Sequence, residues 1–305
     1  MQIIFIIVGF FLLGFITRKF INEPSNLVKW LNNFIIYLAM PSLILLKVPD
    51  LEVSAEVIIP AGVAWAWVLV GSLAVLALSR WQGWPRNTEG AMLLLVTMCN
   101  SSFLGFPMVL AFFDDAVLAY AIFFDQLGGF LILSTYGLIV IAVYTPPLTT
   151  YSNQHVSLGM IVKRVVTFPP FIALLVALFA PVETLLHIAD PFLILLSKPL
   201  MPMALFVLGV QFQPKLLPEH RVPLSAAIGL KMIAAPLFGA AVLIGVGSGG
   251  DVRTATVFEL AMPSMMTPGL MAIHAGIAPR FVATLLGYST VFAFISLPVV
   301  AWCLS

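Results

Sequence analysis

Charged side chains are scarce in this sequence. Asp, Glu, Lys and Arg together make up 9% of its 305 residues, whereas soluble domains carry about 25%. Hydrophobic residues make up 61%, so the composition excludes a water-soluble globular protein. The charges sum to only +1 and the basic residues are scattered, which leaves no basic patch for nucleic acid. We therefore expect an all-α integral membrane protein that contacts the lipid bilayer and binds no nucleic acid.

Cysteines are few, and the common catalytic motifs are missing. Cys99 and Cys303 lie in apolar runs without CxxC spacing and are typical of buried hydrophobic residues. No HExxH spacing joins the four histidines, so no metal centre is expected from them. The GxSxG and Walker A motifs are absent as well. An intramembrane enzyme that uses Ser101 and His274 is the weakest alternative, and we expect a protein that is not an enzyme.

Long apolar runs fill almost the whole sequence. A membrane-spanning helix needs about 20 mostly apolar residues, and we expect ten spans. The first run is a span and not a signal peptide, because Arg18 and Lys19 follow it instead of preceding it. The expected spans are residues 1–17, 27–48, 57–79, 89–112, 116–143, 164–181, 185–212, 222–246, 253–275 and 279–303.

The expected spans divide into two groups of five. The longest polar gap, residues 144–163, contains a Pro pair with Ser, Thr and Asn residues and is typical of a flexible cytoplasmic connector. It separates a first repeat, residues 1–143, from a second repeat, residues 164–305. Because five spans are an odd number, homologous halves form an inverted repeat. One constant offset brings Met40-Pro41 onto Met201-Pro202 and Pro107 onto Pro268, which is consistent with this arrangement.

The basic residues lie mainly on one side of the expected membrane topology. The odd-numbered loops carry Arg18, Lys19, Lys29, Arg80, Arg86, Lys163, Arg164, Lys215, Arg221 and Arg280. On the other side are Lys47, Lys198 and Arg253. Positive residues favour the cytoplasmic side of a membrane protein. The pattern predicts a multi-pass protein of the cell inner membrane with both termini outside the cytoplasm.

Two expected spans are interrupted by residues that break helices. Span four contains CNSSFLGFP, residues 99–107, and span nine contains ELAMPSMMTPGL, residues 259–270. Inside a membrane, a broken helix is tolerated only where protein or a cavity covers it. Half-helix N-termini attract anions, so we predict a binding site for a small organic anion, although helix kinking for packing alone is the alternative. The predicted substrate-binding residues are Asn100, Ser101, Ser102, Gly105, Pro107, Pro263, Ser264, Thr267 and Pro268.

Asp125, Lys231 and Glu259 lie inside expected spans, where a charge is costly unless it faces a cavity or a partner. Asp125 with Gln126, and Glu259, are the expected ion-coupling residues for a proton or for a sodium ion near Glu259. The structural alternatives are that Asp125 hydrogen-bonds a neighbouring helix or pairs with Lys231, and that Glu259 caps the break in span nine or lies near the outer interface. Lys231 is expected to extend its stem to the cytoplasmic face. Beyond the coupling ion, no cofactor is expected.

Several segments together resemble the auxin efflux carrier family of bacterial permeases. They are LAMPSLIL in span two, NSSFLGFP in span four, PLMPMALFVLGV in span seven and AMPSMMTPG in span nine. That family is similar in fold to the plant auxin exporters and to sodium/bile-acid symporters. The resemblance implies a scaffold domain that includes spans one, two, six and seven. It also implies a transport domain in which spans four and nine cross at their breaks, with Asn100 and Pro107 at one crossover and Pro263 at the other.

The sequence departs from that family in span nine, where Pro268 is a second proline and two Met replace smaller polar residues. This departure predicts a less polar pocket. Bacterial members are associated with dicarboxylates such as malate and malonate, but no arginine lies in the interior of an expected span, where it could clamp a second carboxylate. A monocarboxylate or an apolar organic acid is therefore an equal expectation.

These features together predict a secondary active transporter that moves an organic anion by alternating access, with coupling to protons. Two alternatives stay open: a sodium-coupled symporter of organic anions, and a membrane sensor that binds its ligand without moving it. An apolar outer face on the scaffold helices is compatible with a homodimer.

Overall fold

A computed structural model describes residues 2–21, 24–49, 55–146, 157–179, 183–212 and 220–304. Within these ranges the chain is helical and forms no strand beyond one isolated bridge. The α-helices are α1 (Gln2–Thr17), α2 (Pro24–Phe34), α3 (Met40–Lys47), α4 (Ile59–Gln82), α5 (Arg86–Thr97), α6 (Phe106–Phe112), α7 (Asp115–Phe123), α8 (Leu138–Tyr144), α9 (Leu158–Val166), α10 (Pro169–Phe179), α11 (Glu183–Ser197), α12 (Leu200–Gln211), α13 (Arg221–Gly229), α14 (Ala235–Gly245), α15 (Gly250–Leu260), α16 (Met266–His274) and α17 (Pro279–Leu304).

Six continuous helical stretches in the described residues are long and apolar enough to cross a membrane. Several are chains of α-helices joined by π-helical turns, such as Ile35–Ala39 between α2 and α3 and Leu230–Ala234 between α13 and α14. All six match expected spans within a few residues. They are Asn26–Lys47, Glu56–Gln82, Asp115–Tyr144, Ala189–Gln211, Arg221–Gly245 and Pro279–Leu304.

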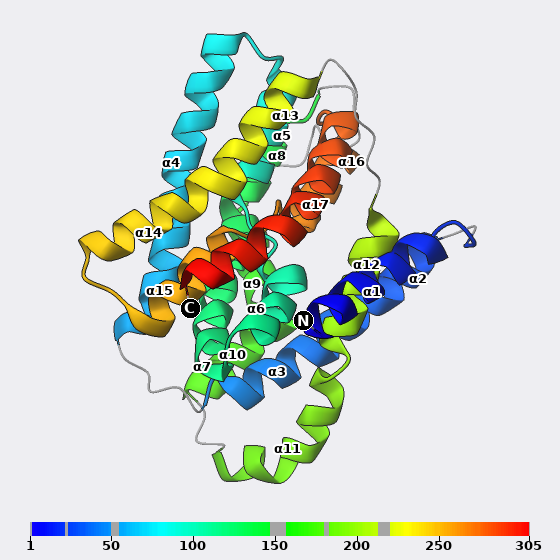
Figure 1. Cartoon of the computed structure of the whole chain (residues 1–305), viewed down its shortest axis with the longest axis vertical. Coiled ribbons are helices and arrows are strands. Elements are labelled where there is room, and N and C mark those ends of the chain that lie inside the picture. Colours follow the sequence, from blue (N-terminus) through cyan, green and yellow to red (C-terminus); the bar gives the residue numbers. More distant parts are fainter. Residues whose placement is uncertain are drawn as a thin grey trace.

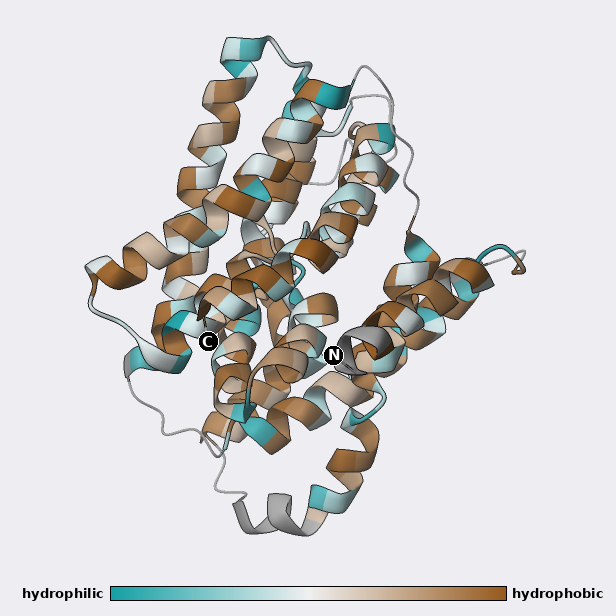
Figure 2. Cartoon of the chain, viewed as in Figure 1, coloured by the Kyte–Doolittle hydropathy of each residue, from teal (hydrophilic) through white to brown (hydrophobic). Residues whose placement is uncertain are grey.

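These long helices are apolar on their outer surfaces as well as in the interior. On α4, Leu69 and Leu73 are each 67% exposed, whereas Trp67 and Val75 are buried. Figure 2 shows hydrophobic residues along the lengths of the helices, with hydrophilic residues mainly at helix ends and in loops. A helix that is hydrophobic all round requires an apolar solvent. The apolar outer surface of these helices therefore fits the lipid of a bilayer.

The expected sixth span, residues 164–181, is not a single helix. Instead α9 and α10 meet at an angle of 66°. Pro169 and Pro170 begin α10, and the residue before a proline is disfavoured in helical conformation, so the helix turns at Thr167 and Phe168. Because α9 starts at Leu158, the last part of the expected connector is helical. Residues 147–156 of the connector lie outside the described residues.

The two predicted helix breaks are present. Helix α5 ends at Thr97, and helical structure resumes at Ser101 as a π-helical turn that leads into α6. Helix α15 ends at Leu260, and α16 begins at Met266. Pro268 lies in the first turn of α16, where its missing N–H has no intrahelical partner to lose. Each expected span is thus two half-helices separated by a short non-helical segment.

A close backbone contact joins α1 to α12. A Cβ added to Gly14 would collide with the backbone of Phe206, and one added to Gly209 would collide with the backbone of Phe11. Small residues let membrane helices approach closely enough for extensive van der Waals contact. Figure 1 shows α1, α2 and α12 together on one side of the molecule, away from α4, α13 and α14. The two sides meet around the broken helices.

Candidate functional site

The two helix breaks cross and bond to each other through their backbones. The Asn100 N–H donates to the Pro263 carbonyl at 2.9 Å, and the Met265 N–H donates to the Met98 carbonyl at 3.2 Å. These bonds flank an antiparallel bridge between Cys99 and Ser264. A broken helix leaves N–H and C=O groups that must be satisfied inside the protein. Each break therefore supplies backbone partners for the other.

Side chains satisfy further carbonyls at the ends of the half-helices. At the end of α5, the Trp67 indole Nε1 donates to the Val96 carbonyl at 3.2 Å. At the end of α15, the Lys231 ammonium donates to the Leu260 carbonyl at 2.9 Å. The last carbonyls of a helix have no intrahelical donors, so these two side chains cap the half-helices just before the crossing.

Asp125 is the centre of a buried hydrogen-bond cluster. The hydroxyls of Ser101 and Ser102 both donate to its Oδ1, and the Gln126 side-chain amide donates to its Oδ2 at 2.7 Å. All four side chains are buried. Asp125 lies on the π-helical turn Phe124–Phe130 and the serines on the turn after the first break. The cluster thus joins the helix of Asp125 to one half of the crossing.

The expectation for Lys231 was wrong. Its side chain does not reach the cytoplasmic face but is fully buried, and its Nζ bonds the Leu260 carbonyl and the Cys99 Sγ, the latter at 3.1 Å. Lys231 lies on the π-helical turn Leu230–Ala234, and its side chain reaches the crossing. Of the two structural alternatives for Asp125, the hydrogen bond to a neighbouring helix is present and the pair with Lys231 is not, because the Asp125 oxygens accept from Ser101, Ser102 and Gln126.

Glu259 lies one residue before the end of α15 and is fully buried. Neither carboxyl oxygen has a hydrogen-bond partner among the residues that the structure describes, so it does not cap the break. The carboxyl lies against Gly105 of the other broken span: a Cβ there would fall 2.6 Å from Oε1. Glycine at position 105 is therefore required for this close approach. Asp125 and Lys231 are near enough to act on Glu259 electrostatically.

Several other polar atoms at the crossing are buried without a partner in the described part of the chain. They are the Nδ2 of Asn100, the Oε1 of Gln126 and the Oγ of Ser264. Buried polar groups are nearly always hydrogen-bonded in proteins, and exceptions call for an explanation such as a ligand, a water or an ion. These atoms offer both donors and acceptors to a polar ligand.

The remaining predicted substrate residues lie further from the bridge along the chain. Pro107 is in α6, beyond the π-helical turn, and does not lie in the extended part of the break. Thr267 and Pro268 are in the first turn of α16. Within the described ranges, no three His, Cys, Asp or Glu side chains converge as metal ligands.

Ser101 and His274 do not pair as a nucleophile and its base. Ser101 bonds Asp125, and the His274 Nδ1 lies 2.8 Å from the Leu270 carbonyl one turn earlier in its own helix. His274 is exposed whereas Ser101 is buried. The two side chains therefore occupy different surroundings.

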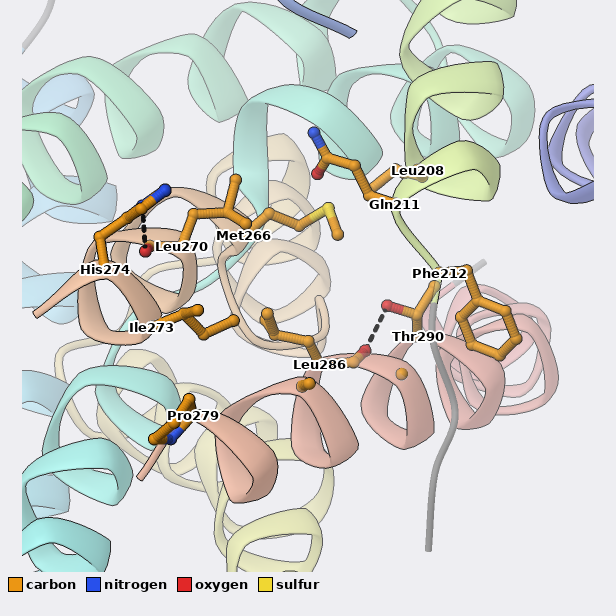
Figure 3. A pocket seen from close by; sticks show the side chains of 12 residues that line it. Leu208, Gln211, Phe212, Met266, Leu270, Ile273, His274, Pro279, Leu286 and Thr290 are labelled. Carbon is orange, nitrogen blue, oxygen red and sulfur yellow. Dashed lines mark hydrogen bonds between the residues drawn. The ribbon is translucent and has the colours of Figure 1, made fainter. Parts of the chain in front are cut away.

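A pocket of about 300 Å³ opens beside the second half of the broken span nine. Figure 3 shows Gln211 of α12 facing Met266 and His274 of α16 across the pocket, with Leu286 and Thr290 of α17 on a further wall. Most of the lining is apolar, and span nine contributes Met266, Leu270 and Ile273 to it. No sequence pattern pointed to the contributions of α12 and α17, since neither carries a break or a charge there. The lining residues are Leu208, Gln211, Phe212, Met266, Leu270, Ile273, His274, Pro279, Ala283, Leu286, Gly287 and Thr290.

Comparison with known proteins points to one class. A family model described as Membrane transport protein matches residues 1–301 of the chain. An uncharacterized transporter of Methanothermobacter thermautotrophicus is 29% identical over 294 residues, which cover 94% of this chain and 92% of that protein. An uncharacterized transporter of Methanocaldococcus jannaschii is 25% identical over 316 residues, which cover 100% of this chain and 98% of that protein.

Proposed function

The chain belongs to the membrane transport protein family, as its resemblance to auxin efflux carriers led us to expect, and from that membership we propose a secondary transporter of a small organic carboxylate. It is a multi-pass membrane transport protein and not an enzyme. The observation that carries the finer proposal is the crossing of two broken helices around buried polar atoms that have no partner in the described residues. Such crossings suit a binding site because half-helix ends present free backbone groups.

The carboxylate of the substrate binds at the N-terminal end of α16. The first N–H groups of a helix have no intrahelical acceptor, and the helix dipole favours an anion there. Met266, the first residue of α16, also lines the apolar pocket. The carboxylate therefore lies toward the break, near Asn100 and Ser264, while the body of the substrate lies in the pocket.

Asp125 and Glu259 provide the coupling to an ion, with a proton as the first choice. A buried carboxyl that loads and releases a proton as access alternates links substrate movement to a pH gradient. Asp125 contacts Ser101 and Ser102 of the broken span four, so a change at its carboxyl reaches the substrate site through two hydrogen bonds. A sodium ion near Glu259 is the alternative, and uptake measured with and without sodium, as described below, separates the two.

Helix contacts support the proposed ten spans and the inverted repeat. If span one corresponds to span six and span two to span seven, the contact of α1 with α12 has its counterpart in that of α10 with α3. The contacts of α4 with α5 and of α14 with α15 form a second such pair. A third pair consists of α6 with α7 and α16 with α17. Contacts that recur between repeats are what an inverted repeat requires.

Alternating access follows from where the pocket lies. Its walls come from α12, which packs on α1, and from α16 and α17, which pack on each other. Movement of the crossing helices against α1 and α12 would open the pocket to one side of the membrane and close it to the other. The positive-inside pattern of the loops supports placing both termini outside the cytoplasm in an inner membrane.

Transport by purified protein in sealed vesicles tests the proposal. Uptake of labelled mono- and dicarboxylates is measured under an imposed pH gradient, in sodium or in choline. We expect one class of carboxylate to be carried, with loss of uptake in Asn100→Ala. Asn33→Ala serves as the matched control, because Asn33 is exposed on α2. Binding without flux would refute the transporter and favour the sensor, and flux that persists in Asn100→Ala would move the site away from the crossing.

A further inference from the structure

Lys231 is a basic side chain in the interior of the crossing. Among the described residues it is the only Lys or Arg that is buried. Its Nζ contacts both broken spans, since Cys99 belongs to the first break and Leu260 is the last residue of α15. Lys231, which is 132 residues from Cys99 in the sequence, thus contacts the crossing through its ammonium group.

Capping alone does not account for a charge at this place. The end of α5 is the counterpart of the end of α15 under the proposed repeat, and there a neutral donor, the Trp67 indole, bonds the Val96 carbonyl. A neutral donor is therefore enough to satisfy a half-helix carbonyl. An ammonium buried without need would be costly, so Lys231 has a second function beyond its hydrogen bond to Leu260.

Glu259 supplies the reason for the charge. Two acidic side chains, Glu259 and Asp125, are fully buried near the crossing. Asp125 has three donors around it, whereas Glu259 has no hydrogen-bond partner in the described residues. The ammonium of Lys231 bonds the carbonyl of Leu260, the residue after Glu259, and acts on the Glu259 carboxyl electrostatically without a direct ion pair. An ammonium has three N–H donors, of which Leu260 and Cys99 take two.

We propose that Lys231 is the resident cation of the crossing: its ammonium holds the end of α15 and compensates the Glu259 carboxyl, the task that a bound sodium ion would otherwise perform. The crossing is therefore stable and works without sodium. A sodium ion needs several oxygen ligands in one place, and the ammonium already lies on the Leu260 carbonyl beside Glu259. This role of Lys231 rests on the proposed transport function only where uptake is measured. The melting experiments below test it independently of transport.

Thermal unfolding of the purified protein tests the resident cation directly. Wild-type protein, Lys231→Gln and Lys231→Met are melted in sodium chloride and in choline chloride at equal ionic strength. We expect an equal melting temperature for wild type in both salts. In choline, both variants should melt at a lower temperature than wild type. Sodium should raise the melting temperatures of the variants by about 3 °C or more, because it binds beside Glu259. Lys198→Met is the control for loss of a lysine, because Lys198 is exposed.

A double variant separates the charge from the cap. Lys231→Gln with Glu259→Gln removes both charges and leaves neutral groups of similar size, so it should melt higher than Lys231→Gln alone and show no response to sodium. If the single variants do not fold, recovery of folded protein in the double variant supports the proposal. If the double variant is no more stable than Lys231→Gln, charge compensation is excluded.

Uptake measurements complete the test. Wild type should carry its substrate equally in sodium and in choline, whereas Lys231→Gln should lose about tenfold or more in choline and regain part of it in sodium. Sodium-dependent uptake or melting of the wild type would overturn the proposal, as would a Lys231→Gln variant that matches wild type in both salts. If wild type moves no carboxylate, the proposed function fails while the melting series still decides the role of Lys231.

Discussion

At Asp125, an isosteric substitution and a truncation should differ strongly in their effect on the stability of the protein. Its two oxygens accept from Ser101, Ser102 and Gln126. Asp125→Ala leaves these three buried donors without their acceptor. Each such donor costs about 1–3 kcal/mol, so the sum is about 3–9 kcal/mol, comparable to the whole stability of a typical domain, about 5–15 kcal/mol.

Asp125→Asn has a much smaller effect on stability. The amide oxygen still accepts from the two serine hydroxyls, and the Gln126 amide can turn so that its Oε1, which has no partner in the described residues, accepts from the new amide N–H. The remaining loss is the difference between hydrogen bonds to a charged and to a neutral acceptor, about 1 kcal/mol per bond, and the smaller desolvation cost of a neutral amide offsets part of it. The substitution removes the ionisable group and keeps the hydrogen-bond cluster.

Two assays on the same purified variants follow from this reasoning. Thermal melting should place Asp125→Asn within about 5 °C of wild type and Asp125→Ala far below it or unfolded. Uptake driven by a pH gradient should fall to background in Asp125→Asn, whereas Asp251→Asn, which alters an exposed carboxyl, should be unaffected. An Asp125→Ala variant as stable as Asp125→Asn would refute the hydrogen-bond account. Undiminished pH-driven uptake in Asp125→Asn would refute the role in coupling.

Three further substitutions test individual contacts. Gly105→Ala should displace the Glu259 carboxyl, which lies against the added methyl group, and reduce uptake more than melting temperature; unchanged uptake would contradict the close approach. Gly209→Val should destabilise the protein strongly, because its side chain meets the backbone of Phe11 and backbone cannot move as a side-chain end can; wild-type melting would exclude this helix contact. Asp114→Ala should cost about 1 kcal/mol by removing the N-cap of α7, and a melting change outside about 0.5–2 kcal/mol would show that the cap is not the main role of Asp114.

The sequence by itself determined the membrane class, six long spans and the positions of both helix breaks. These features are local: span length follows from bilayer thickness, and the break around Pro263 follows from a missing N–H and from steric limits on backbone angles. The burial of Asp125 was also predictable, because a carboxyl within an apolar run must find a partner or a cavity.

The tertiary structure alone decided what meets at the crossing. From the sequence, Lys231 was expected at the cytoplasmic face, because its flexible stem can extend in more than one direction. In the structure it lies on a π-helical turn, and its ammonium bonds Leu260 and Cys99. The sequence also could not show that Gln211 lines a pocket with Met266. These contacts join residues far apart in the chain, and their partners are selected by how whole helices pack, which no local pattern of hydrophobicity or helix breaking records.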